Sequence, residues 1–176
     1  MTIPNLISVF RLLIVPVVIV AILEERWLAA FVLFLVAGLS DGIDGWIARK
    51  FDMRSELGAV IDPLADKAML VSVFVTLAIV GALEEWLVVL VVSRDVMIVL
   101  AYVISWIMDR PMSVKPIFAS KVNTALLIVY AVTVLAANAF GFTLGPFDEI
   151  LSFGIAALTI FTLGAYLVIW LKHMSA

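Results

Sequence analysis

The sequence predicts an all-α integral membrane protein, with six transmembrane helices in one bundle that forms a single domain over residues 1–176. Composition is the first reason: hydrophobic residues are 65% and charged residues 14% of the chain, against about 45–50% and about 25% in a soluble domain. The second reason is six apolar runs, each close to the length of about 20 residues that crosses a bilayer. The third is that basic and acidic connections alternate along the chain, as loops on opposite membrane sides do. The predicted spans are residues 5–23, 27–49, 57–83, 86–108, 118–138 and 149–171.

The first predicted span carries a polar stripe. Pro4 suits the first turn of a helix. Asn5, Ser8 and Arg11 follow at intervals of three, so they share one side of an otherwise apolar helix. Two interpretations remain open. The stripe is either a helix start whose arginine extends to the membrane surface, or a contribution to an active site, because an intramembrane arginine is costly unless it faces a polar cavity.

The second and third predicted spans hold four aspartates in a mostly apolar region. Asp41 and Asp44 are spaced i, i+3, and Asp62 and Asp66 are spaced i, i+4, so each pair lies on one helical face. The segment between the spans is polar and charged, which predicts a turn that reverses the chain. Two helices joined by that turn would bring the four carboxylates into one cluster. Pro63 either kinks the third span or marks its first turn.

Such a cluster needs compensating positive charge, because close carboxylates repel one another strongly. Hard divalent cations with a preference for oxygen ligands meet this need, and Mg²⁺ or Mn²⁺ fits best. Gly45, Ala48 and Gly58 leave room for a ligand beside the acids, and Arg49 adds a cation suited to phosphate. Acids, metal, space and an arginine together predict a phosphoryl-transfer site.

The remaining three spans contain few polar residues. Arg94 and Asp95 interrupt the fourth span, and Arg94 forms either a structural ion pair within the bundle or a site for the phosphate of an incoming substrate. Lys121 opens the fifth span. Gly154 and Gly164 in the sixth span permit close helix packing, and we expect no other chemistry in these last two spans.

Charge asymmetry orients the predicted bundle. The positive-inside rule puts both termini and the turn between the aspartate pairs in the cytoplasm, and the even number of spans agrees. The active site is therefore expected at the cytoplasmic end of the second and third helices. The net charge of −3 indicates no affinity for nucleic acid. The basic side carries Arg49, Lys50, Arg54, Arg110, Lys115, Lys121 and Lys172, and the acidic side carries Glu24, Glu25, Glu84, Glu85, Asp148 and Glu149, with Arg26.

The aspartates and their neighbours form one long pattern with fixed gaps. The pattern resembles the full motif of the CDP-alcohol phosphotransferases, membrane enzymes that join a CDP-linked group to an alcohol and release CMP. The flanking strings TIPNLIS, DPLADK, SRDVM and KPIFASKVNTA resemble one branch of that family, the cardiolipin synthases that use CDP-diacylglycerol. Leu126 and Leu127 depart from many glycerol-accepting relatives, which have a glutamine after NTA. The pattern reads Asp41-x2-Asp44-Gly45-x2-Ala48-Arg49-x8-Gly58-x3-Asp62-x3-Asp66.

The resemblance implies a reaction and a role for each residue. The phosphatidyl group of CDP-diacylglycerol would pass to phosphatidylglycerol by direct displacement, giving cardiolipin and CMP. Two Mg²⁺ or Mn²⁺ ions would bridge the diphosphate. The residues implied are Asp41, Asp44, Asp62 and Asp66 for the metals, Asp66 also as general base, Gly45, Ala48, Arg49 and Gly58 for CDP-diacylglycerol, and Arg94 and Lys121 for the acceptor phosphate.

Alternatives remain at two levels. The nearest alternative acceptor is glycerol 3-phosphate, a dianion whose site would place two or more cations around one phosphate. A different class of protein, a cation transporter, is disfavoured because transporters place such acids near the bilayer midplane, often in repeated halves. The resemblance also implies a homodimer, with small residues allowing close contact between helices. The absence of a transit peptide favours a bacterial inner membrane as the location.

Overall fold

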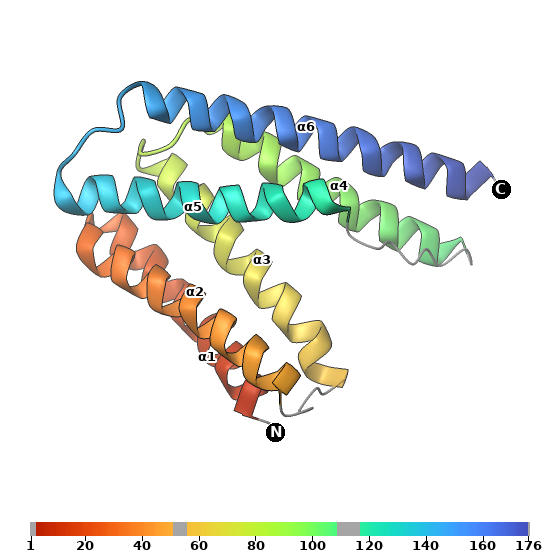
Figure 1. Ribbon diagram of the computed structural model, residues 1–176, viewed down its shortest axis with the longest axis horizontal. Coiled ribbons are helices and arrows are strands. Elements are labelled where there is room, and N and C mark those ends of the chain that lie inside the picture. Colours follow the sequence, from red (N-terminus) through yellow and green to blue (C-terminus); the bar gives the residue numbers. More distant parts are fainter. Residues whose placement is uncertain (1–2, 51–55, 109–116, 176) are drawn as a thin grey trace. The chain divides into compact units, whose positions relative to one another are not determined.

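Six helices make up the part of the chain that the computed structural model describes, and no strand occurs there (Figure 1). The described backbone covers residues 3–50, 56–108 and 117–175, and the described side chains are those of residues 10–40, 67–101, 103–108 and 117–175. Each helix falls on one predicted span, so the all-α expectation is confirmed. The helices are α1 (Ile3–Leu23), α2 (Trp27–Lys50), α3 (Glu56–Ile79), α4 (Glu85–Ile107), α5 (Phe118–Phe140) and α6 (Pro146–Ser175).

The chain forms two compact units. The first unit comprises Met1–Leu83 and Ala131–Thr143, and the second comprises Glu84–Tyr130 and Leu144–Ala176. Helices α1, α2 and α3 therefore belong to the first unit, and α4 and α6 belong to the second. Helix α5 contributes its N-terminal part to the second unit and its C-terminal part to the first.

In the first unit, α1 packs against both α2 and α3. Val18 and Ile22 of α1 are fully buried, as are Val73 and Leu77 of α3. Arg11 lies on the same face of α1 as Val18 and Ile22, at spacings of seven and eleven residues, and is only 2% exposed. Arg11 is therefore turned into the unit rather than to its surface.

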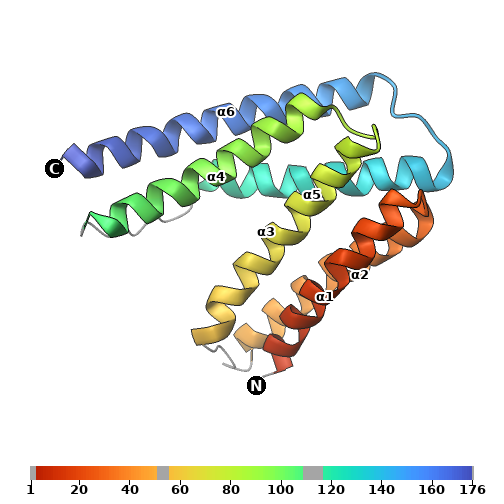
Figure 2. The ribbon, with the colours of Figure 1, turned by 180° about the vertical axis from the view of Figure 1, so that it is seen from behind.

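The second unit is built on the packing of α4 against α6. Leu87 of α4 and Ile155 of α6 are buried. Near the start of both helices, the rings of Trp86 and Phe153 lie 5.6 Å apart between centroids, at an interplanar angle of 31°. Figure 2 shows α4 and α6 running side by side from the other direction.

Apolar side chains also cover the exposed faces of both units. Leu13 of α1 is 66% exposed and Phe153 of α6 is 65% exposed, and helices that are apolar on every side suit a lipid environment. Among the described residues, α4, α5 and α6 are long and apolar enough to cross a membrane. The apolar stretches described in α1, α2 and α3 are shorter, namely Phe10–Leu23, Trp27–Ser40 and Lys67–Ile79. The expectation of an integral membrane protein is confirmed.

Helix α3 ends four residues before the end of the predicted third span, because a left-handed residue stops it. Gly81 has φ of 74°, and its N–H donates to the carbonyl of Ala78 at 2.9 Å. The N–H of Ala82 donates to the carbonyl of Leu77 at 2.8 Å. These two bonds form the Schellman motif, which satisfies carbonyls that the helix end would leave unpaired.

The same termination occurs at the ends of α1 and α5. The left-handed residues there are Glu25, with φ of 55°, and Gly141, with φ of 70°. The N–H of Arg26 donates to the carbonyl of Ala21 at 2.8 Å, and the corresponding bond after α5 is 3.1 Å long. Glu25 is thus the one described non-glycine residue with positive φ, and this conformation costs an L-residue about 1–2 kcal/mol.

The structure bears on two predictions about helix interiors. Helix α3 begins at Glu56, so Pro63 lies inside the helix and the alternative of a first-turn proline is wrong. The close helix packing that Gly154 and Gly164 permit is not formed within the described part of this chain. A Cβ atom added at either glycine would meet no atom within 4 Å.

Candidate functional site

The aspartate motif lies on two consecutive helices. Asp41 and Asp44 fall within α2, and Asp62 and Asp66 fall within α3, so the helical spacing assumed for both pairs holds for the backbone. The predicted nucleotide-binding residues Gly45, Ala48, Arg49 and Gly58 also lie in these two helices. The side chains of all these residues lie outside the described part of the structure.

The backbone brings the two halves of the motif to the same end of the first unit. Helix α2 ends at Lys50 and α3 begins at Glu56, and six residue steps span at most about 22 Å when fully extended. In both views, the C-terminal end of α2 and the N-terminal ends of α1 and α3 lie together (Figures 1 and 2). This arrangement agrees with the predicted turn between the aspartate pairs.

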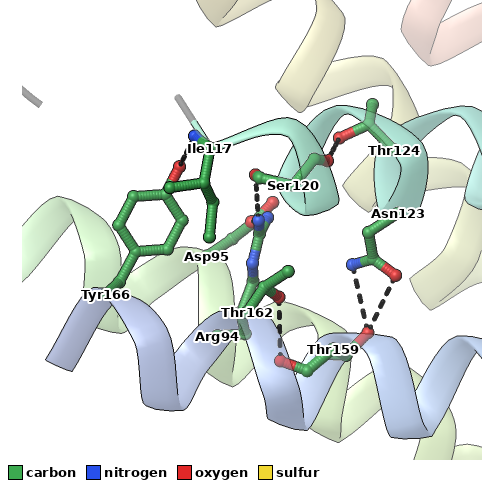
Figure 3. A network of polar contacts seen from close by, with 9 residues as sticks. All are labelled: Arg94, Asp95, Ile117, Ser120, Asn123, Thr124, Thr159, Thr162 and Tyr166. Carbon is green, nitrogen blue, oxygen red and sulfur yellow. Dashed lines mark hydrogen bonds and ion pairs between the residues drawn. The ribbon is translucent and has the colours of Figure 1, made fainter. Parts of the chain in front are cut away.

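A second group of candidate residues lies in the second unit, around Arg94 (Figure 3). Arg94 is only 4% exposed. Its Nη1 donates to Oδ1 of Asp95 at 2.5 Å, and its Nη2 donates to the hydroxyl of Ser120 at the start of α5. The predicted ion pair of Arg94 and Asp95 is therefore present. Nε of Arg94 is buried and has no hydrogen-bond acceptor among the described residues.

Lys121, the other predicted acceptor residue, directly follows Ser120 and is exposed. The contact between Arg94 and Ser120 therefore brings the middle of α4 to the first turn of α5. Lys121 lies in that same turn. Both residues belong to the second unit. The two cations that the sequence assigned to one phosphate thus lie on neighbouring helical segments.

Helix α6 contributes polar groups that the sequence analysis did not assign. The ring of Tyr166 lies under the guanidinium of Arg94, with 6.0 Å between the guanidinium carbon and the ring centroid. The hydroxyl of Tyr166 accepts a bond of 3.4 Å from the N–H of Ile117. Thr159 exchanges hydrogen bonds of 3.1 and 3.3 Å with the amide of Asn123 on α5. Figure 3 shows these contacts joining α4, α5 and α6.

A periodic signal for these residues exists in the sequence. Thr159, Thr162, Tyr166 and Trp170 follow one another at intervals of three or four, which places them on one face of a helix that is otherwise apolar. Thr159 and Thr162 are completely buried. The indole N–H of Trp170 donates to the hydroxyl of Ser105 on α4 at 2.9 Å. Threonine side chains in membrane-spanning helices often form hydrogen bonds to neighbouring helices, so this stripe could have indicated the buried face of α6, although the sequence analysis did not use it.

An apolar groove is lined by residues of α4 and α6. It has a volume of about 650 Å³, and among the described residues that line it, Ser93 is the one with a hydroxyl group. The small residues Ala156 and Ala157 of α6 form part of its wall. Because its walls are apolar and it is open at the surface, the groove has the character of a site for hydrocarbon.

These features define a class of protein: a helical membrane protein with an acidic motif at the adjoining ends of two consecutive helices. It also has a buried arginine, Arg94, in a network of polar contacts. The chain matches the CDP-alcohol phosphatidyltransferase family over residues 1–171. It belongs to that family, so the resemblance to the CDP-alcohol phosphotransferases is confirmed. This membership also favours the transferase over the cation transporter.

Individual relatives include two CMP-forming cardiolipin synthases, from Rattus norvegicus and Homo sapiens. Each is 36% identical to this chain in an alignment 166 residues long, which covers 85% of this chain and 55% of the relative. The chloroplastic CDP-diacylglycerol–glycerol-3-phosphate 3-phosphatidyltransferase 1 of Oryza sativa subsp. japonica is 33% identical over 158 residues, covering 80% of this chain and 48% of the relative. The chain thus spans about half the length of these curated relatives.

Proposed function

We propose that this protein transfers the phosphatidyl group of CDP-diacylglycerol to phosphatidylglycerol and releases CMP, as a cardiolipin synthase does. The observation that carries the proposal is the 36% identity, over 85% of the chain, to CMP-forming cardiolipin synthases. The complete aspartate motif on α2 and α3 supports the nucleotide half of the reaction.

The donor set of the motif fits a divalent metal site. Four carboxylates on two adjoining helix ends supply the hard oxygen ligands that Mg²⁺ and Mn²⁺ prefer. Asp41, Asp44, Asp62 and Asp66 would hold two such ions, which when bound would neutralise charge on the diphosphate and on the departing phosphate. Among the described side chains, no group of three or more acids, histidines or cysteines offers a competing site.

The remaining motif residues would bind and orient the donor lipid and move one proton. Gly45, Ala48 and Gly58 would allow the cytidine to approach the helix backbones, and Arg49 would hold phosphate through its fork of N–H donors. Asp66 would accept the proton of the acceptor hydroxyl. The acceptor oxygen would then form its bond to the β-phosphorus as the bond to the CMP oxygen breaks, in one displacement without a covalent enzyme intermediate.

Arg94 and Lys121 would bind the phosphate of the acceptor. Burial of Arg94 and the absence of an acceptor for its Nε–H among the described residues support this role, because a buried donor without a partner is costly. Phosphatidylglycerol carries one phosphodiester charge and two acyl chains. One buried cation, one exposed lysine and an apolar groove lined in part by Ser93, the sequence neighbour of Arg94, suit that lipid better than a soluble dianion.

The proposed protein is one domain over residues 1–176, with six membrane-spanning helices and its active site at the cytoplasmic end of α2 and α3. The acidic connections between α1 and α2 and between α3 and α4 support this orientation through the positive-inside rule. A bacterial inner membrane is the proposed location, and a homodimer the proposed assembly.

A CMP-release assay tests the proposed function most directly. Purified protein in detergent would receive CDP-diacylglycerol and one acceptor at a time, and CMP would be measured with the acceptor as the only variable. We expect release with phosphatidylglycerol and formation of cardiolipin. If CMP were released with glycerol 3-phosphate but not with phosphatidylglycerol, the acceptor assignment would be wrong and the family assignment would stand.

Glycerol 3-phosphate is the second candidate acceptor. The Oryza sativa relative, whose name includes this acceptor, is 33% identical to this chain, close to the 36% of the cardiolipin synthases. Leu126 argues against it, because the residue after NTA is apolar rather than a polar contact for a soluble dianion.

A further inference from the structure

Tyr166 of α6 contacts Arg94 and the backbone of Ile117, just before the turn of α5 that carries Lys121. It is 9% exposed. Its ring faces the guanidinium of Arg94, and its hydroxyl bonds to the backbone at the start of α5, which carries Lys121 (Figure 3). One side chain therefore contacts the cation on α4 and the helix start that presents the cation on α5.

The contact with Arg94 restricts how its guanidinium is oriented. Asp95 and Ser120 each bind one of the two terminal nitrogens. The Tyr166 ring, at 6.0 Å, lies at the outer limit for an attraction between a cation and an aromatic face. Together these groups fix the plane of the guanidinium, so the direction of its remaining donor, Nε–H, is also fixed.

The contact with α5 acts through Ile117. Its N–H is one of the donors that a helix N-terminus leaves unpaired, and the Tyr166 hydroxyl accepts it at 3.4 Å. The carbonyl of Ile117 in turn accepts the N–H groups of Ser120, at 3.0 Å, and of Lys121, at 3.4 Å. Tyr166 thus binds Ile117, the residue whose carbonyl accepts the first hydrogen bonds of α5.

We propose that Tyr166 is a positioning residue for the acceptor phosphate, which sets the direction of Arg94 and the first turn of α5 without touching the reacting atoms. This inference rests on the proposed function, because it takes Arg94 and Lys121 as the acceptor site. The tyrosine ring and hydroxyl would each carry part of the effect, so the two parts are separable by substitution.

Steady-state kinetics of Tyr166→Phe and Tyr166→Leu test the proposal, with Tyr130→Phe as the matched control. Tyr130 is another buried tyrosine of the same unit, and its hydroxyl donates to Asp148 at 2.8 Å, away from Arg94. We expect Tyr166→Phe to raise KM for phosphatidylglycerol about threefold to tenfold, as loss of one hydrogen bond allows. Its kcat and its KM for CDP-diacylglycerol should stay close to wild type. Tyr166→Leu should raise the acceptor KM further, and Tyr130→Phe should not raise it.

Arg94→Lys completes the test, because it separates this inference from the proposed function. If Arg94→Lys raises the acceptor KM and Tyr166→Phe does not, the positioning role is wrong and the acceptor site stands. If Arg94→Lys leaves the acceptor KM unchanged, the acceptor assignment itself is wrong. An equal rise in both KM values for Tyr166→Phe, or a fall in thermal stability with unchanged kinetics, would show a structural role only. In the double variant Arg94→Lys with Tyr166→Phe, the rise in acceptor KM should be smaller than the product of the rises in the two single variants.

Discussion

The paired hydrogen bonds of Asn123 and Thr159 offer the sharpest test of the packing between α5 and α6. Both residues are completely buried, and the Thr159 hydroxyl takes part in both bonds. Thr159→Val removes both bonds while the side chain keeps its shape. Interhelical hydrogen bonds in membrane proteins contribute about 0.6 kcal/mol on average, and an unpaired buried amide costs about 1–3 kcal/mol. We expect a loss of stability of about 1–2 kcal/mol.

For a chain of this length, that loss lowers Tm by about 2–8 °C, because 1 kcal/mol corresponds to about 2–4 °C. The measurement is thermal unfolding of the purified protein in a mild detergent, followed by circular dichroism. Thr124→Val is the control. Among the described residues its hydroxyl bonds to the Ser120 carbonyl, one turn back on an exposed face, so its effect should stay within about 0.5 kcal/mol.

The double variant decides whether the pair acts as a unit. Asn123→Leu keeps the branching of the side chain, so Asn123→Leu with Thr159→Val replaces both polar groups by apolar groups of similar shape. Such replacement is nearly neutral, and we expect the double variant to be no less stable than Thr159→Val alone. If the two single losses simply added, or if Thr159→Val had the Tm of wild type, the coupling of the buried pair would be refuted.

Four further outcomes are expected. Asp44→Asn and Asp62→Asn should each abolish CMP release while the protein still inserts and folds, and a chelator should stop the wild-type reaction reversibly; activity in excess chelator would contradict the metal site. Arg94→Ala and Lys121→Ala should raise KM for phosphatidylglycerol more than KM for CDP-diacylglycerol, and an equal rise would argue against an acceptor role. Glu25→Gly should raise Tm by about 2–4 °C by relieving the left-handed φ of 55°, whereas no change would mean that the local backbone carries no strain. Native mass measurement in lipid nanodiscs should give a dimer, and a monomer mass would end that proposal.

The helices could be predicted from sequence because apolar runs of the right length are a local signal. Their ends could not be predicted so well, because they depend on single backbone conformations. Hydropathy continues to residue 83, yet α3 ends at Ile79 because Gly81 turns left-handed. At the other extreme, α6 continues to Ser175 past the apolar run, where Lys172 and His173 lie in its last turn and suit the negative end of the helix dipole.

For the candidate site too, local patterns could be predicted from the sequence and contacts between helices could not. The aspartate motif is a pattern in the chain, and its helical backbone follows from that pattern. The ion pair of Arg94 with Asp95 was also predictable, since the two are neighbours. The contacts of Arg94 with Ser120 and Tyr166 join residues 26 and 72 positions apart. They depend on the register between helices, which no local pattern encodes. The stripe on α6 indicated a buried polar face but not its partners.

The division of α5 between the two units has a consequence for how the protein can be dissected. The first unit needs Ala131–Thr143 in addition to Met1–Leu83, so no single cut of the chain releases a whole unit. A fragment that ends at Leu83 would carry the complete aspartate motif but lack part of the body into which its helices pack. Separately expressed fragments should therefore regain activity only when the second one brings α5 intact, and complementation between fragments becomes a measure of assembly within the membrane.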